Sequence, residues 1–267
     1  LSAQDLLTNY RISDDNDAPD FDIESATKLN DIFDVWFESG SSWFALLNDR
    51  QNAPQADLYL EGSDQHRGWF HLSLLTSLAV QHQAPYKSLL THGFIVDKEG
   101  RKMSKSSGNA LTVDQILKDY GAEVTRWWVS SLSYENDIKV DLSFFKEAGD
   151  LYRKIRNTLR FILSNLNDFN LPLEACLKEA ESFSHHSIDA FALHETTIFE
   201  EKVLKLYKNY QFKDANNAIY HFCNDTLSSM YLTTIKDRLY CDAANSTARR
   251  QSQITLRIIL EILTRIN

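Results

Sequence analysis

Hydrophobic residues in the second half of the chain recur at intervals of three and four positions, with polar residues between them. This is the spacing of amphipathic helices that turn one face towards a core. We interpret the resulting stripes as packing surfaces, and they predict a bundle of about four long helices. The four stripes are Leu151, Ile155, Leu159, Ile162, Leu163 and Leu166; Phe199, Val203, Leu206 and Tyr210; Ile219, Phe222, Cys223, Leu227 and Met230; and Leu256, Ile259, Leu263 and Ile266.

The first half has shorter apolar runs that are separated by polar turns. Residues 56–60 form a strand candidate that ends at Glu61 and Gly62, and residues 88–96 form a second, buried candidate. Since a strand, a helix and a strand within about 40 residues make a βαβ unit, a parallel sheet is expected here. The helix between the strands is expected to bury one face, made of Trp69, Leu72, Leu75 and Ala79.

Glycine marks the change between the two halves. All eight glycines lie at or before Gly149, and after that residue only Pro172 interrupts the chain. Before it, Gly121 separates two further predicted helices, residues 113–120 and 123–130. The fold class is therefore α/β followed by all-α. Three parts are predicted: an irregular acidic connector over residues 1–30, an α/β domain over residues 31–148, and a helical domain over residues 149–267.

The net charge of −9 argues at first against a nucleic-acid partner. The charge is unevenly distributed, because residues 1–38 hold ten acids against Arg11 and Lys28. Residues 150–267 hold 15 Lys and Arg against 14 Asp and Glu, a balance of +1. The helical half can therefore present a basic face to nucleic acid.

Several classes of protein do not fit the composition. No apolar run is long enough for a membrane span, and the start carries no signal-peptide pattern, so no membrane partner is expected. Cys176, Cys223 and Cys241 are widely spaced, which favours neither a zinc site nor a disulfide framework. We interpret them as buried free thiols of a cytoplasmic protein. Because the chain begins at Leu1 rather than Met, we expect it to be an internal piece of a longer protein.

A cation-rich stretch runs from Gly100 to Asn109 with the order Gly-Arg-Lys-Met-Ser-Lys-Ser-Ser-Gly-Asn. Lys and Arg neutralise phosphate charge, Ser hydroxyls donate to phosphate oxygens, and Gly allows close approach of the main chain. This composition suits a nucleotide triphosphate. The alternative is a solvated basic turn, which is the usual role of a charge run.

Polar residues also follow the first predicted strand. Ligands bind beyond the carboxyl ends of parallel strands, where Glu61 could hold an ammonium group and Gly62 allows close approach. Asp64 could accept hydrogen bonds from ribose hydroxyls, and Gln65 could bind a polar ligand edge. The alternative, which spacing alone favours, makes Ser63 or Asp64 the N-cap of the following helix.

Three further side chains have both a functional and a structural interpretation. His92, in the string Thr91-His92-Gly93 of the second predicted strand, is either a site residue or a hydrogen-bonded structural histidine. Trp36 and Trp69 could wall an apolar pocket, although two core tryptophans need no ligand. No metal-ligand cluster, Ser/His/Asp order or Walker loop is present in the sequence.

Five strings, taken together and in order, resemble the isoleucyl-tRNA synthetases, a family of class I aminoacyl-tRNA synthetases. The resemblance covers residues 31–170 strongly and continues weakly through residues 235–240. The strings are Asp-Val-Trp-Phe-Glu-Ser-Gly (34–40), Leu-Tyr-Leu-Glu-Gly-Ser-Asp-Gln-His-Arg-Gly-Trp-Phe (58–70), Leu-Thr-His-Gly-Phe (90–94), Lys-Met-Ser-Lys-Ser (102–106) and Tyr-Arg-Lys-Ile-Arg-Asn-Thr-Leu-Arg-Phe (152–161).

This resemblance implies a fold and an activity. The chain would hold the second half of a Rossmann-like nucleotide-binding domain with its Lys-Met-Ser-Lys-Ser loop, then part of an anticodon-binding helix bundle. The full enzyme would use ATP to activate L-isoleucine as isoleucyl-AMP and would transfer it to tRNA(Ile). Mg²⁺ would arrive with ATP, bridging its phosphates, and the full-length enzyme is expected to be a monomer.

The resemblance also implies residue roles. Glu61 and Gln65 would contact the aminoacyl-adenylate, and Trp36 and Trp69 would wall the isoleucine pocket. Gly62, Asp64 and Lys105 would bind ATP. Lys102 and Lys105 would stabilise the charge that develops as the carboxylate attacks the α-phosphate. His92 and Ser104 are additional candidates in the same motifs. On the first bundle helix, tRNA contact and a solvated face are equally expected for its four cations, Arg153, Lys154, Arg156 and Arg160.

Parts of the family pattern are missing from the sequence. The upstream His-Ile-Gly-His-type motif, the editing domain and a C-terminal zinc module are absent, and Ser41-Ser42-Trp43-Phe44 departs from the family pattern. We expect the chain alone to be inactive and to expose a sheet edge and apolar surface. The alternatives are a tRNA- or partner-binding module without catalysis, and a valyl enzyme.

Overall fold

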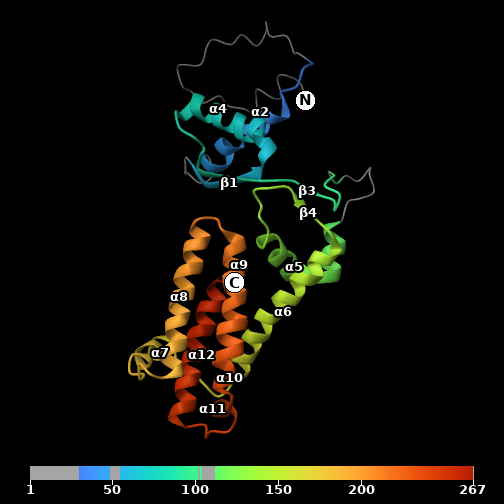
Figure 1. The fold of residues 1–267 in the computed structure, drawn as a ribbon. Coiled ribbons are helices and arrows are strands. Elements are labelled where there is room, and N and C mark those ends of the chain that lie inside the picture. Colours follow the sequence, from blue (N-terminus) through green and yellow to red (C-terminus); the bar gives the residue numbers. More distant parts are fainter. Residues whose placement is uncertain (1–29, 49–54, 102, 104–111, 267) are drawn as a thin grey trace. The chain divides into compact units, whose positions relative to one another are not determined.

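The computed structural model describes residues 30–48, 55–101, 103 and 112–266, which divide into two compact units at Leu90 (Figure 1). Nearly all of the predicted connector over residues 1–30 lies outside the described residues, as do Lys102, Ser104 and Lys105. The boundary predicted at Gly149 stays a prediction.

The first unit is built from short helices around one strand pair. Asp34 starts its first helix as an N-cap, because the carboxylate accepts a hydrogen bond from the Trp36 amide at 2.8 Å. The elements in order are α2 (Val35–Gly40), the π-helix η1 (Phe44–Asn48), β1 (Ala56–Gly62), the 3₁₀-helix η2 (Ser63–Arg67), α4 (Trp69–Gln81) and β2 (Tyr86–His92).

Strands β1 and β2 pair with each other, and α4 connects them. The Ala56 amide donates to the Pro85 carbonyl at 2.8 Å, so the two strands start side by side. This arrangement is that of a parallel pair, and it confirms the predicted βαβ unit. Within the described residues this sheet consists of β1 and β2, and the exposed sheet edge stays a prediction.

The buried face of α4 was predicted wrongly. Phe70, Ser73 and Ser77 are its buried residues, whereas Leu75 is 50% exposed. Apolar side chains occur on all faces of α4 itself, so their spacing along the sequence does not identify one buried face. Close packing selects the small side chains instead: a Cβ on Gly40 of α2 would lie only 2.6 Å from Leu72 Cβ.

The second unit begins with a break in a predicted strand. Instead of one buried strand over residues 88–96, the chain forms the half-buried β2 and then β3 (Ile95–Val96). The Gly93 amide leaves the sheet and donates to the Tyr134 carbonyl at 2.8 Å. A Cβ on Gly93 would lie 2.3 Å from the Asn136 main chain, so only glycine fits this crossing.

Strand β3 pairs in parallel with β4 (Ile138–Lys139), with Val96 opposite Lys139. In the sequence, α5 (Val113–Ser130) lies between these two strands, and it is kinked at Gly121, which has φ 82° and ψ 163°. The two helices predicted around this glycine are therefore confirmed as the two halves of α5. Thr112 caps the first half by accepting from the Gln115 amide at 3.3 Å.

A helix bundle follows, as predicted. Most residues of the predicted stripes are buried or half-buried in one cluster, while Leu163 and Met230 face outwards. The helices are α6 (Leu142–Ser164), α7 (Leu173–Ala180), α8 (Ile188–Lys208), α9 (Phe212–His221), the π-helix η4 (Phe222–Tyr231), α10 (Leu232–Thr234), α11 (Lys236–Tyr240) and α12 (Thr247–Ile266).

One buried carboxylate ties four of these helices together. Asp189 of α8 is 1% exposed and accepts hydrogen bonds from the Tyr231 hydroxyl at 2.8 Å and the Ser252 hydroxyl at 3.0 Å. Its other oxygen accepts from Arg238 Nη1 of α11, also at 2.8 Å. A buried charge with this many donors is compensated, so Asp189 fixes how the helices meet.

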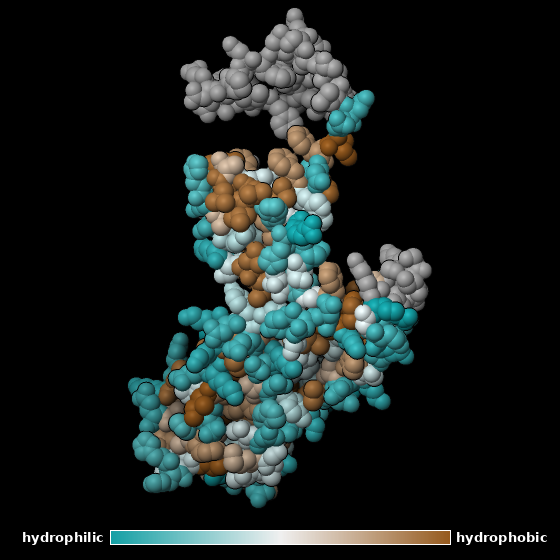
Figure 2. Space-filling view, turned by 45° about the horizontal axis from the view of Figure 1, so that its top comes forward, coloured by the Kyte–Doolittle hydropathy of each residue, from teal (hydrophilic) through white to brown (hydrophobic). Residues whose placement is uncertain are grey.

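Exposed apolar side chains are numerous in the first unit (Figure 2). Ile32 is 91% exposed, Phe33 72% and Val80 62%. The predicted exposure of apolar surface is thus present in the described residues. No helix among those residues is both long enough and apolar enough to cross a membrane.

Candidate functional site

The carboxyl end of β1 leads directly into the candidate site. Glu61 and Gly62 are its last residues, and Glu61 Oε1 accepts the Gly62 amide at 3.0 Å. The predicted alternative, with Ser63 or Asp64 as an N-cap, is wrong. Gly62 is the N-cap of η2, and Gly68 is the N-cap of α4. Glycine has no side chain, so neither N-cap residue can accept a main-chain amide through a side chain.

Gln65 supports the start of α4 in their place. Its side-chain carbonyl Oε1 accepts the Trp69 amide at 3.0 Å, and its Nε2 donates to Asp64 Oδ2 at 3.1 Å. Gln65 therefore satisfies one of the main-chain donors that a helix start leaves without a partner. The same two bonds fix the orientation of the Gln65 amide beside Asp64.

The structure brings three predicted residues of the first unit, Trp36, Gln65 and Trp69, together around Gly68. A Cβ on Gly68 would lie 2.8 Å from Gln65 Oε1 and 3.4 Å from Trp36 Cε3. The Trp36 ring thus rests on the glycine main chain next to Gln65. Trp36 is 42% exposed, so part of its apolar ring is open to a ligand.

Trp69 is held on two sides. Its indole N–H donates to the Ser39 carbonyl at 3.0 Å, and its ring stacks on Tyr59 with 4.4 Å between centroids and 8° between planes. Tyr59 is neutral at physiological pH, and burial raises the pKa of its hydroxyl further above the usual value. A ring fixed in this way is suited to being a rigid wall.

His92 belongs to the second unit and has a main-chain partner. Its Nδ1 lies 2.8 Å from the Gly93 carbonyl, which can only accept, so Nδ1 carries the proton. This contact orients the ring at the end of β2. It fits the structural interpretation of His92, and a role in the site stays a prediction.

The sequence prediction assigned no role to Asp97, just before the cation-rich stretch, or to Met103 within it. Asp97 is buried beneath the turn that ends at Arg101, and its carboxylate raises the pKa of the Arg101 guanidinium. Met103 packs against the large hydrophobic cluster of the second unit. The signal for Asp97 was available, because aspartate ahead of a glycine turn often accepts main-chain hydrogen bonds.

The first bundle helix presents its cations on the outside. Arg153, Lys154, Arg156 and Arg160 are all exposed. Arg153 pairs with Asp150 at 2.8 Å, while the other three have no ion pair within the described part of the chain. α6 therefore carries an outward row of positive charge.

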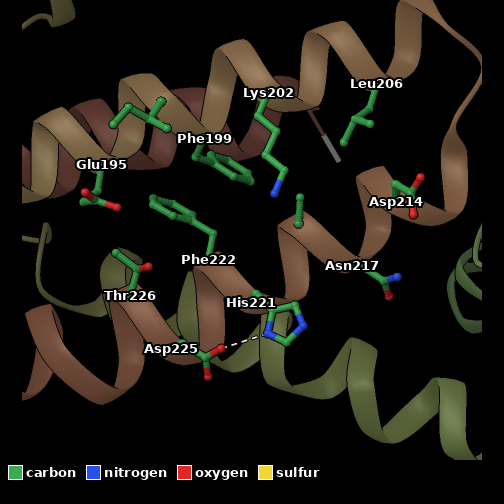
Figure 3. A pocket seen from close by; sticks show the side chains of 12 residues that line it. Glu195, Phe199, Lys202, Leu206, Asp214, Asn217, His221, Phe222, Asp225 and Thr226 are labelled. Carbon is green, nitrogen blue, oxygen red and sulfur yellow. Dashed lines mark hydrogen bonds and ion pairs between the residues drawn. The ribbon is translucent and has the colours of Figure 1, made fainter.

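A hollow of about 630 Å³ opens between α8 and α9, and its lining, unlike the outer face of α6, is not dominated by positive charge (Figure 3). The stacked rings of Phe199 and Phe222, 4.1 Å apart, form part of its lining. His221 Nδ1 lies 2.8 Å from Asp225 Oδ2, and this contact lowers the pKa of that carboxyl. Three carboxylates face one lysine and one histidine here, so the hollow does not favour anions: Glu195, Asp214 and Asp225 against Lys202 and His221.

Metal ligands do not gather in the described part of the chain. No group of three or more His, Cys, Asp or Glu side chains there could hold an ion. The described residues thus offer no protein cage for Mg²⁺, which usually binds through one or two carboxylates and substrate phosphates.

Two family models match the chain. The model described as tRNA synthetases class I (I, L, M and V) matches residues 7–141. The model described as the anticodon-binding domain of tRNA ligase matches residues 189–266.

Similar curated proteins carry the name isoleucine–tRNA ligase. The protein from Nautilia profundicola is 44% identical over 260 residues, which cover 95% of this chain and 28% of that protein. The protein from Desulfitobacterium hafniense is 46% identical over 245 residues, covering 91% of this chain and 26% of that protein. The chain therefore spans about a quarter of the length of the curated relatives it matches.

Solved structures share the fold at low sequence identity. The LeuRS–tRNA–LeuAMS ternary complex from Agrobacterium radiobacter aligns with a TM-score of 0.61 and 17% identity, over 87% of this chain and 30% of that one. Methionyl-tRNA synthetase from Mycobacterium tuberculosis with methionyl-adenylate aligns with a TM-score of 0.58 and 18% identity, over 79% and 41%.

Proposed function

Because the chain belongs to the class I tRNA synthetases (I, L, M and V), we propose that it is part of an isoleucine–tRNA ligase. The full enzyme activates L-isoleucine with ATP, releases pyrophosphate and transfers isoleucine to tRNA(Ile). We assign it to the cytoplasm as a monomer, and we assign the three free thiols to a reducing compartment. Isoleucine as the substrate is supported by relatives that are 44% and 46% identical.

One observation carries the amino-acid site: Trp36, Gln65 and Trp69 converge on Gly68. The open part of the Trp36 ring and the fixed Trp69 ring form the apolar wall for an aliphatic side chain. Glu61 and Gln65 supply polar groups beside that wall for the adenylate. Gly62 and Asp64 follow at the end of β1 and take the ATP side of the same site.

The cations of the Lys-Met-Ser-Lys-Ser loop supply the electrostatic part of the chemistry. Lys102 and Lys105 stabilise the negative charge that grows on the α-phosphate and the leaving pyrophosphate. No covalent enzyme intermediate is needed. Mg²⁺ comes bound to the ATP phosphates. We also assign Ser104 and His92 to this reaction.

We assign residues 31–148 to the catalytic part and residues 149–267 to the anticodon-binding part. Within the second, the cationic row on α6 is the tRNA-facing surface, because phosphate contacts require positive charge. The hollow between α8 and α9 is excluded as a phosphate surface by its carboxylates. This contrast favours tRNA contact over a merely solvated face for Arg153, Lys154, Arg156 and Arg160.

Pyrophosphate exchange tests the proposal. In the full-length enzyme, Lys105→Ala is expected to reduce isoleucine-dependent ATP–pyrophosphate exchange by roughly 100-fold or more, as for other groups that stabilise transition-state charge. An unchanged rate refutes the role of Lys105. Running the wild-type enzyme with isoleucine and with valine decides the substrate, and a preference for valine refutes isoleucine.

A further inference from the structure

A buried carboxylate shapes the turn that leads out of β3. The Asp97 side chain is 9% exposed. Its Oδ1 accepts the Glu99 amide at 3.1 Å and the Arg101 amide at 2.8 Å, and its Oδ2 accepts Arg101 Nε at 3.0 Å. Three donors thus come from within four residues of the acid itself.

Main-chain bonds close the same turn. The Asp97 amide donates to the Arg101 carbonyl at 2.9 Å, and the Gly100 amide donates to the Asp97 carbonyl at 2.9 Å. Gly100 has φ 84°, a conformation that suits glycine. The turn is therefore closed at both ends before its side chains are considered.

Strand pairing anchors the turn to the rest of the second unit. Val96 lies opposite Lys139 in the parallel β3–β4 pair, and the Val140 amide donates to the Val96 carbonyl at 2.9 Å. Val96 and Val140 are both 6% exposed. Asp97 directly follows Val96, which the strand pair holds in place. The bonds from Arg101 to the Asp97 carboxylate therefore hold Arg101 close to the strand pair.

The next residue in the sequence is Lys102, which the proposed function places in the reaction. Both of its described neighbours are anchored: Arg101 by Asp97, and Met103 by packing against the hydrophobic cluster of the second unit. A buried carboxylate is costly unless it is well compensated, and the main chain alone already closes the turn. The Asp97 carboxylate adds to this closure two bonds to Arg101, from its amide and from its guanidinium, and these fix the direction in which the chain leaves the turn.

We propose that Asp97 is a positioning residue for adenylation, which holds Arg101 and thereby sets where the chain enters the Lys-Met-Ser-Lys-Ser stretch. This inference rests on the proposed function of that stretch. It acts by holding Arg101, the residue that precedes Lys102. Since a displacement of about 1 Å can cost roughly 100-fold in rate, loss of this anchor affects catalysis more than binding.

The test compares Asp97→Ala and Asp97→Asn in the full-length enzyme, with pyrophosphate exchange as the readout. Asp97→Ala is expected to lower kcat by roughly 10- to 100-fold while the KM for isoleucine stays within twofold. Asp97→Asn keeps an acceptor for both amides and loses the ion pair to Arg101, so a smaller loss in kcat, roughly three- to tenfold, is expected.

Asp141→Asn is the matched control, because Asp141 also accepts a main-chain amide, that of Ser143 at 2.9 Å, at the start of α6. It is expected to leave kcat within twofold. If Asp97→Ala does not fold, Asp97→Asn decides by the same criterion. A folded Asp97 variant with kcat within twofold of wild type overturns the inference, and so does a loss that Asp141→Asn reproduces.

Failure of the inference is separable from failure of the proposed function. A wild-type enzyme that exchanges pyrophosphate with valine instead of isoleucine refutes the proposed substrate. The Asp97 series is then measured with valine, and the same kcat criterion applies. Hydrogen exchange of the Glu99 and Arg101 amides gives an independent readout, because both are expected to exchange faster in Asp97→Ala.

Discussion

The indole N–H of Trp69 donates a 3.0 Å hydrogen bond to the main-chain carbonyl of Ser39, which joins α4 to the end of α2. The ring that makes this bond also stacks on Tyr59 of β1. Three elements of the first unit therefore meet at one side chain. Because Trp36 lies on α2 and Gly68 precedes α4, the Trp69–Ser39 bond holds the two tryptophans in register.

Replacing Trp69 by Phe tests this relationship. The variant keeps an aromatic ring for Tyr59 but loses the bond to Ser39, so α2 and Trp36 are expected to shift relative to α4. We expect the KM for isoleucine to rise roughly 5- to 10-fold, the equivalent of about 1 to 1.5 kcal/mol for a lost hydrogen bond, while the KM for ATP changes little. Steady-state pyrophosphate exchange measures both constants.

Trp43→Phe is the control for this prediction. The Trp43 indole also donates a partly buried hydrogen bond in the first unit, to Thr76 Oγ1 at 3.0 Å. Its loss is expected to lower stability by a similar amount without changing the KM for isoleucine. Equal KM changes in the two variants would show that Trp69 matters only for stability.

The sequence alone predicts the parts of the fold that local rules determine. Regular spacing located the bundle, and a single glycine located the α5 kink, because Gly121 adopts a φ of 82°. The break between β2 and β3 was missed. It depends on the approach of Asn136 to Gly93, a contact between residues far apart in the sequence that no periodicity encodes.

Charge reversal on α6 tests the proposed tRNA surface. Arg156→Glu and Arg160→Glu are each expected to raise the KM for tRNA in aminoacylation, by roughly three- to tenfold at physiological salt. Pyrophosphate exchange needs no tRNA and is expected to remain at the wild-type rate. The effect is expected to weaken as salt increases, since phosphate contacts release counterions.

Lys202→Glu is the matched control: the same charge reversal at the hollow between α8 and α9, which is not proposed to bind tRNA. Lys202 lines the hollow between α8 and α9, where three carboxylates already lie. We expect this variant to aminoacylate tRNA as the wild type does. If Lys202→Glu raises the KM for tRNA as much as Arg156→Glu, the assignment of the tRNA surface to α6 is wrong.

Thiol reactivity is expected to differ sharply among the three cysteines. Burial raises the pKa of Cys223 to about 12 and also raises the pKa of Cys176, so neither forms much thiolate at pH 8. Cys241 is exposed, contrary to the expectation of three buried thiols. Iodoacetamide at pH 8 followed by peptide mass spectrometry is expected to label Cys241 first, and all three residues at similar rates in urea. Early labelling of Cys223 in the native protein would contradict its burial.

The candidate site was only partly predictable. Glu61, Gly62 and Asp64 could be placed at a strand end because parallel sheets bind ligands there. The role of Gln65 could not be deduced, since spacing favoured Ser63 or Asp64 as the helix cap. Glycine at the helix start lets Gln65 reach the Trp69 amide, and this geometry depends on how Trp36 packs on Gly68.

The acid dependence of stability is expected to report on Asp168. Partial burial raises the pKa of this carboxyl, but the Gln253 amide at 2.7 Å and the Arg249 guanidinium at 3.0 Å outweigh it, so the pKa lies below its usual value. A carboxyl whose pKa is lower in the folded state than in the unfolded state stabilises the fold at pH values above its unfolded-state pKa. This stabilisation is lost as the pH falls through the folded-state pKa. In urea unfolding of this chain, Asp168→Asn is expected to be less stable than wild type by about 0.5 to 1 kcal/mol at pH 7, a modest value because the side chain is half exposed. The difference is expected to stay constant down to about pH 5 and to shrink below about pH 4. A difference that grows on acidification would mean that the pKa of Asp168 is raised instead.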